Sequence, residues 1–349
     1  MLPPPPKESI VDGHVESYYS IQTGEWSELQ FIIDPLLRLH DLTPALNYGQ
    51  QAFEGLKAYR TPSGEIQIFR PQKNARRMMH SVSYVSVPPV PEEKFLSCVR
   101  LAVARNAAYV PPHGASAALY IRPIIFGSSA TLAMASPDKY TFCVYVTPVG
   151  VAYGINAISA LILEDYDRVA PEGSGRAKVG GNYSPLVRHN HQRSTKYGVL
   201  LHLDSKTRTE INKFSMSGFA GIKASFDENG NATGTYTVVG PTPARIIESV
   251  TSDSICEIAK NLGWKTECRT VRYDELPTFT EVLAVGTAGT LVPIKSITRK
   301  STGDVFSYNN ESDERGPCCA KLLSILKELQ QGSVEDRFGW CTKVDKVSD

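Results

Sequence analysis

Short apolar segments alternate along the chain with longer segments in which apolar residues recur every three or four positions. The short segments are bounded by glycine, proline or polar turn residues and predict strands, whereas the longer ones predict helices. In the first half the pattern predicts strands at 29–33, 56–59, 66–69, 118–126 and 141–147, and helices at 71–84 and 92–106. In the second half it predicts strands at 157–163, 198–203, 217–224, 281–286 and 291–297, and helices at 184–197, 252–262 and 318–331. This order of elements predicts an α+β fold.

A glycine-punctuated segment at 148–156 predicts a connection between two domains. At 349 residues the chain has the length of two domains. We therefore predict a small N-terminal domain at 1–146, an interdomain loop at 147–159 and a larger C-terminal domain at 160–349.

The composition favours a small-molecule partner. The chain is 42% hydrophobic and 21% charged, with a formal net charge of +1, and no long basic cluster occurs beyond a pair such as Arg76-Arg77. A nucleic-acid-binding protein is expected to carry a larger basic surface. No run of eighteen apolar residues occurs, so we expect no membrane-spanning helix.

Neither the first nine residues nor the cysteines have the pattern of an exported protein. Residues 1–9 are a proline run followed by charged residues, without the apolar core of a signal peptide, so we expect a cytoplasmic protein. The seven cysteines are an odd number and contain no CxxC pair, which predicts reduced structural thiols and no metal site.

One lysine, Lys178, stands almost directly before the paired glycines Gly180 and Gly181. A lysine amine can form a Schiff base with an aldehyde cofactor and can move protons once a substrate has displaced it. A single lysine in a loop is more often a solvated side chain, so the interpretation depends on the residues that accompany it.

Other segments have the composition of a phosphate site. Residues 250–253 lie at the predicted start of a helix, where backbone amides and the Thr251 hydroxyl can hold a dianion. Polar residues at a helix start are also common caps, and each segment alone is weak evidence. Residues 286–289 form a second small-residue turn that contains Thr287. Arg77, on the predicted helix 71–84, can add bidentate contacts to a phosphate, and we expect Arg76 to face solvent.

Seven motifs follow one another along the chain. They are Tyr48-Gly49 with Phe53-Glu54-Gly55; Phe69-Arg70-Pro71 with Asn74 and Arg77; Tyr120-Ile121-Arg122-Pro123; Lys178 to Tyr183; Leu203-Asp204; Val250-Thr251; and Gly286-Thr287-Ala288. In these motifs the chain resembles the branched-chain aminotransferases, fold type IV enzymes that use pyridoxal phosphate. The resemblance covers nearly the whole chain.

The resemblance implies a role for each matching residue. It implies that Lys178 carries the cofactor as a Schiff base and that Tyr183 hydrogen-bonds the phenolic oxygen of the cofactor. The residues implied to bind the phosphate are Arg77, Val250, Thr251 and Thr287. The residues implied to line the substrate pocket are Tyr48, Phe53, Tyr120 and Arg122, and groups near Thr287 and Ala288 are implied to help hold the substrate carboxylate.

The resemblance also implies an architecture and a reaction. The architecture is a small α/β domain and a larger domain with the cofactor between them, in a homodimer that shares its active site. The reaction is transamination of a hydrophobic amino acid, with 2-oxoglutarate as the acceptor 2-oxo acid.

One position departs from the family. When the segment is anchored on Met216 and Phe219, Asn212 stands where relatives carry a glutamate that pairs with the pyridine nitrogen of the cofactor. A carboxylate keeps that nitrogen protonated, so the ring can accept electrons from the substrate. A neutral amide does not supply this charge. By the resemblance Asn212 is still a cofactor-binding residue, but the electron sink is predicted to be weaker.

The departure leaves several interpretations open. Glu210 lies on the same face of an extended segment as Asn212, at an offset of roughly 7 Å. A one-residue bulge would reverse the parity and bring Lys213 to the ring instead. Transamination can persist at a reduced rate, in specialised metabolism for example. Alternatively, the scaffold has moved to racemase-like or eliminase-like chemistry, or to a reaction in which the cofactor is only incidental. A third possibility is an inactive cofactor-binding protein.

Overall fold

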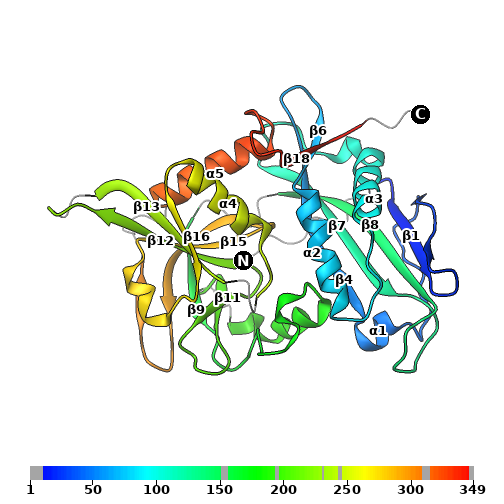
Figure 1. The fold of residues 1–349 in the computed structure, drawn as a ribbon, viewed down its shortest axis with the longest axis horizontal. Coiled ribbons are helices and arrows are strands. Elements are labelled where there is room, and N and C mark those ends of the chain that lie inside the picture. Colours follow the sequence, from blue (N-terminus) through cyan, green and yellow to red (C-terminus); the bar gives the residue numbers. More distant parts are fainter. Residues whose placement is uncertain are drawn as a thin grey trace. The chain divides into compact units, whose positions relative to one another are not determined.

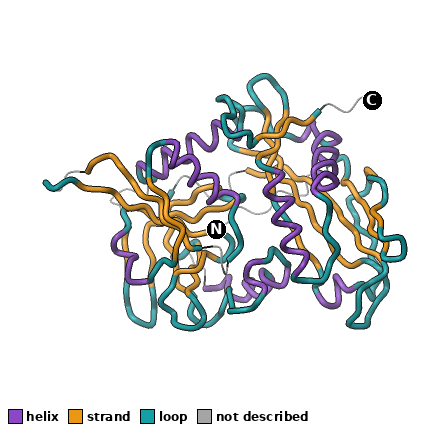
Figure 2. Tube along the Cα trace, in the orientation of Figure 1, coloured by secondary structure: helices purple, strands orange, loops and turns teal. Residues whose placement is uncertain are grey.

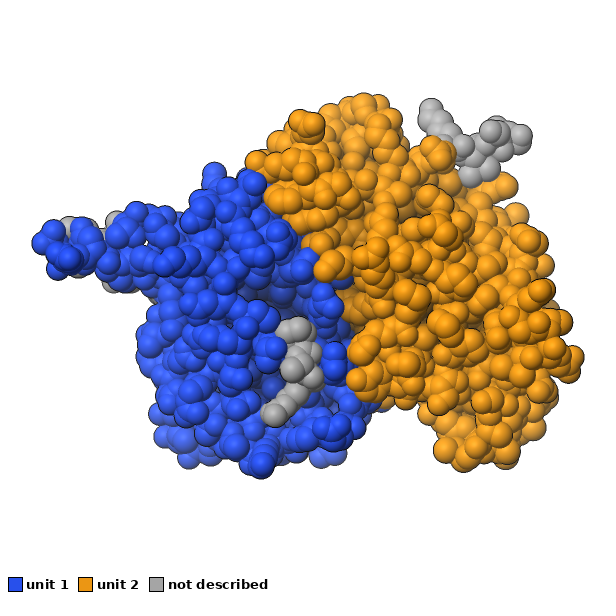
Figure 3. Space-filling view, in the orientation of Figure 1, with its two compact units in different colours: residues 1–3, 151–176, 182–327 blue, residues 4–150, 177–181, 328–349 orange. Residues whose placement is uncertain are grey.

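The computed structural model describes residues 11–150, 156–192, 196–229, 232–242, 246–308 and 315–345 (Figures 1 and 2). The chain divides into two units (Figure 3). Unit 1 contains the described residues of 151–176 and 182–327, and unit 2 contains those of 4–150, 177–181 and 328–349.

This division differs from the predicted domains at two segments. Residues 177–181 belong to unit 2, where Val179 forms an antiparallel bridge with Ala52. The C-terminal segment also belongs to unit 2, because strand β18 (Cys341–Val344) pairs with β6 (Ile66–Phe69). Of the predicted interdomain loop, residues 147–150 are part of a strand and residues 151–155 lie outside the described residues.

Unit 2 is built on one nine-stranded sheet. Its other strands are β1 (His14–Ser20), β2 (Glu25–Trp26), β3 (Gln30–Ile32), β4 (Gln51–Phe53), β5 (Leu56–Arg60), β7 (Ala117–Gly127) and β8 (Lys139–Gly150). The order is β18-β6-β5-β7-β8-β1-β2, with β3 paired to β1 and β4 paired to β7. Neighbouring strands are antiparallel, so alternate side chains of each strand reach opposite faces.

Helices pack on this sheet to form the core of unit 2. They are α1 (Pro44–Tyr48), α2 (Pro71–Ser83) and α3 (Glu92–Arg105), with a short 3-10 helix at Ala107–Tyr109. Helix α2 starts with a proline, which suits the first helical turn, and α3 carries two glutamates in its first turn. Phe95 of α3 stacks on Phe142 of β8 with ring centroids 5.8 Å apart.

Unit 1 contains a second nine-stranded sheet, which is mixed. Its strands are β9 (Ile158–Ile162), β10 (Val199–Leu203), β11 (Ile211–Phe214), β12 (Gly218–Phe226), β13 (Ala232–Pro241), β14 (Lys265–Arg269), β15 (Glu281–Gly286), β16 (Thr290–Thr298) and β17 (Val305–Ser307). The order is β11-β10-β9-β16-β15-β12-β13-β14, with β17 paired to β16. Strand β9 is parallel to both of its neighbours. Phe219 links Phe214 and Phe279 in the core, with ring centroids 6.0 and 5.9 Å apart.

The remaining helical elements are α4 (Val250–Asn261), α5 (Pro317–Gln330) and the 3-10 helices η2 (Ser174–Arg176), η3 (Gly180–Asn182), η4 (Ser184–Gln192) and η5 (Tyr273–Thr278). The predicted helices at 71–84, 92–106, 252–262 and 318–331 are confirmed to within two residues at each end. The predicted helix at 184–197 is wrong in type, because η4 is a 3-10 helix. Within the described ranges, no helix is long and apolar enough to cross a membrane.

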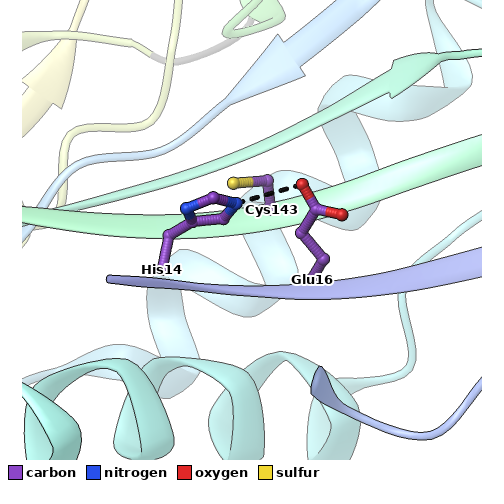
Figure 4. Close-up of side chains that lie close together, drawn as sticks. All are labelled: His14, Glu16 and Cys143. Carbon is purple, nitrogen blue, oxygen red and sulfur yellow. Dashed lines mark hydrogen bonds and ion pairs between the residues drawn. The ribbon is translucent and has the colours of Figure 1, made fainter. Parts of the chain in front are cut away.

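Several strands were not predicted from the apolar pattern, and β1 shows the reason. His14 and Glu16 are polar but buried on one face of β1, where His14 Nε2 lies 3.1 Å from Glu16 Oε1 (Figure 4). Glu16 also accepts a hydrogen bond from the Tyr18 hydroxyl. The hydrogen bond from His14 lowers the pKa of Glu16 against the opposing effect of burial, and burial raises the pKa of the neighbouring Cys143 thiol. All seven cysteines are free thiols in the structure.

Candidate active site

The backbone of Lys178 is attached to two elements of unit 2. The Phe53 amide, on β4, donates to the Lys178 carbonyl at 3.0 Å, and the Lys178 amide donates to Ser81 Oγ of α2 at 2.9 Å. The side chain runs along Phe53, with Nζ 4.5 Å from the ring centroid. A strand and a helix therefore orient an amine that the sequence alone places in a loop.

Glu54 is a buried carboxylate in unit 2 to which the sequence analysis assigned no role. Arg77 donates to it from Nε and from Nη2, each at 2.7 Å, and Asn74 Nδ2 donates at 2.7 Å. Burial opposes its ionisation, but Arg77, Lys178 and Asn74 together hold the pKa of Glu54 below its usual value. The motif Phe53-Glu54-Gly55 marked this position without indicating its partner.

The neighbouring Arg76 is engaged differently. Its side chain is 66% exposed and donates from Nε to Glu92 at 3.2 Å. The prediction that Arg76 faces solvent is confirmed, whereas Arg77 turns two of its nitrogens to Glu54.

Three of the predicted substrate residues meet in unit 2. Tyr120 and Arg122 are alternate residues of β7, and Arg122 Nη2 donates to the Tyr120 hydroxyl at 3.1 Å. The Arg122 guanidinium lies 4.8 Å from the Phe53 ring centroid. A Cβ at Gly55 would overlap the Tyr120 hydroxyl, which explains a glycine there. The buried Nε of Arg122 has no hydrogen-bond partner among the described residues, so it can still donate to a carboxylate.

Tyr48, the fourth predicted substrate residue, is at the end of α1. It is 48% exposed, and its hydroxyl donates to the Leu132 carbonyl. This hydrogen bond ties Tyr48 to the loop between β7 and β8.

In unit 1, the predicted phosphate residues Val250 and Thr251 open helix α4. The helix begins two residues earlier than predicted, with Ser249 as its N-cap accepting from the Ser252 amide at 3.1 Å. The first amides of a helix lack intrahelical acceptors and carry the positive end of the helix dipole. The amides of Val250 and Thr251 are therefore oriented for an anion.

Thr287 and Ala288 lie in the hairpin turn between β15 and β16, where Gly286 pairs with Thr290. The start of α4 and the β15–β16 hairpin turn both lie close to Ser217 and Gly218, at the start of β12. A Cβ at Gly286 would lie 3.3 Å from Ser217 Oγ, and one at Gly218 would lie 2.9 Å from Ser252 Oγ. The first turn of α4 and the first residue of this hairpin turn thus both lie beside the dipeptide Ser217-Gly218.

Tyr183 contacts an arginine that the sequence analysis did not identify. The guanidinium of Arg168 lies 5.0 Å from the Tyr183 ring centroid. Arg168 is only 3% exposed, and none of its three guanidinium nitrogens has a hydrogen-bond partner in the described part of the chain. Burial lowers the pKa of Arg168, against the effect of Tyr183 and Tyr166. No motif marked this residue, because its burial depends on the fold.

Asn212 is an extra residue in strand β11. The register pairs His202 with Lys213 and then Leu203 with Ile211, so Asn212 has no residue opposite it. Its Nδ2 donates to the Leu203 carbonyl at 3.0 Å. This is the one-residue bulge that the sequence analysis left open.

Asn212 lines a cavity of about 240 Å³ in unit 1. The cavity is lined by Glu210, Ile211, Asn212, Pro241, Thr242, Ile246 and Thr270. Asn212 and Glu210 therefore line the same space.

Comparison with known families identifies the chain. The family described as amino-transferase class IV matches residues 51–297, which is most of the sequence. The chain belongs to the class IV aminotransferases. Its cofactor is pyridoxal phosphate, as predicted. In unit 2, Lys178 suits an aldehyde and the unpartnered Nε of Arg122 suits a carboxylate; in unit 1, the helix-start amides of Val250 and Thr251 suit a phosphate.

Fungal proteins are among the relatives of this class IV aminotransferase. It is 50% identical over 348 residues to aminotransferase atnJ of Emericella nidulans, with 99% of each chain covered. It is 50% identical over 335 residues to aminotransferase poxL of Penicillium oxalicum, with 96% of this chain and 90% of the relative covered. The chain is therefore an aminotransferase-like enzyme.

Solved structures show the same fold. The branched-chain amino acid aminotransferase of Escherichia coli superposes with a TM-score of 0.75 at 20% identity, covering 96% of this chain and 100% of the other. The branched-chain amino acid aminotransferase of Thermobaculum terrenum, solved in its PLP-form, gives a TM-score of 0.73 at 18% identity, covering 97% and 100%. The predicted α+β fold of type IV is confirmed.

Proposed function

We propose that this class IV aminotransferase transfers the amino group of a hydrophobic amino acid to a 2-oxo acid, with Lys178 as the catalytic base. The observation that carries the proposal is the placement of the Lys178 amine beside Phe53, whose ring also contacts Arg122. An amine that moves a proton and a cation that holds a carboxylate are the two groups that transamination of an amino acid requires.

For the cofactor, we propose Lys178 as the covalent attachment and Tyr183 as the partner of the phenolic oxygen. The residues proposed for the phosphate are Val250, Thr251 and Thr287, with Arg77 contributing beyond its pair with Glu54. When bound, pyridoxal phosphate supplies the electron sink of the reaction. Asn212 is retained as a cofactor-binding candidate away from the ring nitrogen, through its amide carbonyl and the N–H that it does not donate to Leu203.

For the substrate, we propose recognition of an apolar side chain and a carboxylate. Phe53 and Tyr120 offer aromatic surface, and Tyr48 supplements it. Arg122 holds the carboxylate with its unpaired Nε, and the turn at Thr287 and Ala288 adds backbone groups. This arrangement favours a branched-chain or similar hydrophobic amino acid. We further propose a role in specialised metabolism, because no carboxylate occupies position 212.

We propose that the protein is a homodimer. The segment after β3 exposes several apolar side chains, and a second copy of the chain would cover them. They include Ile33, Leu36, Leu46 and Tyr48, which are 84%, 67%, 63% and 48% exposed. Sedimentation equilibrium should give twice the monomer mass, and Leu36→Asp with Leu46→Asp should shift the protein toward monomer. A monomeric parent protein would contradict this proposal.

The reaction is tested with the purified protein and pyridoxal phosphate. We expect a Schiff-base absorbance band, an adduct on Lys178 after borohydride reduction and peptide mapping, and loss of the band when L-leucine is added. Pyridoxamine phosphate is the expected product. A band that persists with every hydrophobic amino acid would exclude transamination and favour the racemase-like, eliminase-like or inactive alternatives. Lys178→Arg keeps the charge but should abolish the adduct.

A further inference from the structure

The bulge in β11 determines which of its side chains face the core of unit 1 and which face away from it. Strand β10 directs Leu201 and Leu203 into the core of unit 1, so His202 between them lies on the opposite face. Lys213 is the residue opposite His202, and directly opposed residues project to the same face of a sheet. Lys213 is 4% exposed. The extra residue, Asn212, is what brings a lysine to this buried face.

The face that carries Lys213 and His202 is cationic. Burial, followed by the charges of Lys213 and Arg168 and a smaller effect of His189, lowers the pKa of His202 to about 3. His202 Nε2 and Ser215 Oγ form a hydrogen bond of 2.7 Å, in which the tautomer of the ring decides which atom donates. These groups are therefore close enough for each charge to act on the others.

The side chains that act most on His202 and Arg168, among the described residues, are basic or phenolic. Among the described residues, no acidic side chain is a main influence on the pKa of His202 or Arg168. The carboxylate of Asp165 lies 3.7 Å from His189 Nδ1, but its side chain is 57% exposed. The titratable groups that act on Arg168 are the phenols of Tyr166 and Tyr183. Tyr183 connects this face to the proposed cofactor site, because it is the residue proposed for the phenolic oxygen.

We propose that Lys213, and not Asn212, faces the ring nitrogen of bound pyridoxal phosphate and donates a hydrogen bond to it, so that the nitrogen is unprotonated. This inference rests on the proposed function and names a further residue of that site. An ammonium is a donor with no acceptor capacity, so it pairs only with a nitrogen that keeps its lone pair. The positive charge of Arg168 also disfavours a proton on the ring nitrogen, because like charges repel. A cation at Lys213 would thus face the ring nitrogen, where relatives in the family place the carboxylate of a glutamate.

The proton on the ring nitrogen can be measured directly. Pyridoxal phosphate labelled with 15N at the ring nitrogen is bound to the full chain, and the 15N resonance moves upfield when that nitrogen is protonated. We expect the resonance of an unprotonated nitrogen in the parent protein at neutral pH. A protonated resonance in the parent overturns the inference.

Two neighbouring substitutions form a matched pair. Lys213→Glu should move the resonance to that of a protonated nitrogen, because it supplies a carboxylate on the same face. Asn212→Glu should leave the resonance unchanged, because Asn212 is the extra residue of the bulge and is not the residue opposite His202. A shift in Asn212→Glu overturns the inference, whether or not Lys213→Glu also shifts.

A second measurement does not depend on the folding of the glutamate variant. The deaza analogue of the cofactor has a C–H in place of the ring nitrogen and cannot accept a hydrogen bond. The parent protein should bind pyridoxal phosphate about tenfold more tightly than the analogue, and Lys213→Met should bind the two within about twofold. Equal binding by the parent protein overturns the inference.

Peptide mapping separates this inference from the proposed function. A borohydride adduct on Lys178 together with a protonated ring nitrogen refutes only the role of Lys213. Failure of the parent protein to form any adduct on Lys178 refutes both proposals.

Discussion

Glu54 and Arg77 form a bidentate ion pair inside unit 2, with Nε–Oε1 and Nη2–Oε2 distances of 2.7 Å. The Glu54 side chain is fully buried, and that of Arg77 is 11% exposed. Two charges removed from water in this way depend on each other, because either one alone would be a buried, uncompensated charge.

Replacing Glu54 by glutamine should therefore destabilise the protein. Glu54→Gln keeps the shape of the side chain but leaves Arg77 without its counter-charge, and we expect the free energy of unfolding to fall by about 3 kcal/mol. Urea denaturation measures the change. Glu92→Gln is the matched control, since it breaks the exposed pair with Arg76 and should cost less than about 1 kcal/mol. Equal costs for the two variants would show that the buried pair does not stabilise the fold.

His202 should make stability depend on pH. Its pKa is about 3 in the folded protein and 6.5 in an unperturbed chain. As the pH falls below 6.5, the unfolded state binds a proton that the folded state does not, so the free energy of unfolding should decrease by up to about 1.4 kcal/mol per pH unit until about pH 3.

Substitution separates this contribution from the other titrating groups. His202→Gln should flatten the dependence of the free energy of unfolding on pH below 6.5, measured by urea denaturation at a series of pH values. His113 is exposed, so His113→Gln should retain the slope of the parent protein. An unchanged slope in His202→Gln would mean that His202 is already protonated in the folded protein.

Arg122 should determine the affinity for the substrate carboxylate. Its Nε has no partner among the described residues, so Arg122→Gln removes a charged donor at this position. We expect KM for a hydrophobic amino acid to rise roughly 10- to 100-fold, the range for loss of a hydrogen bond to a charged group. The Lys178 Schiff-base band should persist. A matching increase in KM for the corresponding amine, which lacks the carboxylate, would argue against this role.

Thr251 should contribute to binding of the cofactor phosphate. Thr251→Val keeps the side-chain volume at the second position of α4 and removes only the hydroxyl. We expect the affinity for pyridoxal phosphate to fall about tenfold. The affinity for pyridoxal, which has no phosphate, should not change. Parallel losses for both compounds would instead indicate a disturbed helix start, which circular dichroism can detect.

Much of the fold and the family could be predicted from local sequence. Helix α2 follows its apolar spacing and its initial proline, and β15 follows a short apolar run. Strand β1 could not be predicted in the same way, because His14 and Glu16 satisfy each other only after folding. Likewise, the partner of Glu54 is 23 residues away, and no local spacing indicates it.

The sequence by itself determined the aminotransferase family, the identity of Lys178 as the candidate base, and the absence of a glutamate at position 212. The tertiary structure decided what surrounds these residues. The pairing of β11 with β10 absorbs Asn212 as an extra residue and turns Lys213 to the face of His202, and burial leaves Arg168 without a hydrogen-bonded carboxylate among the described residues. Side-chain direction in a strand depends on register, and register is set by pairing between distant segments, so a motif can name a position without showing which way its side chain faces.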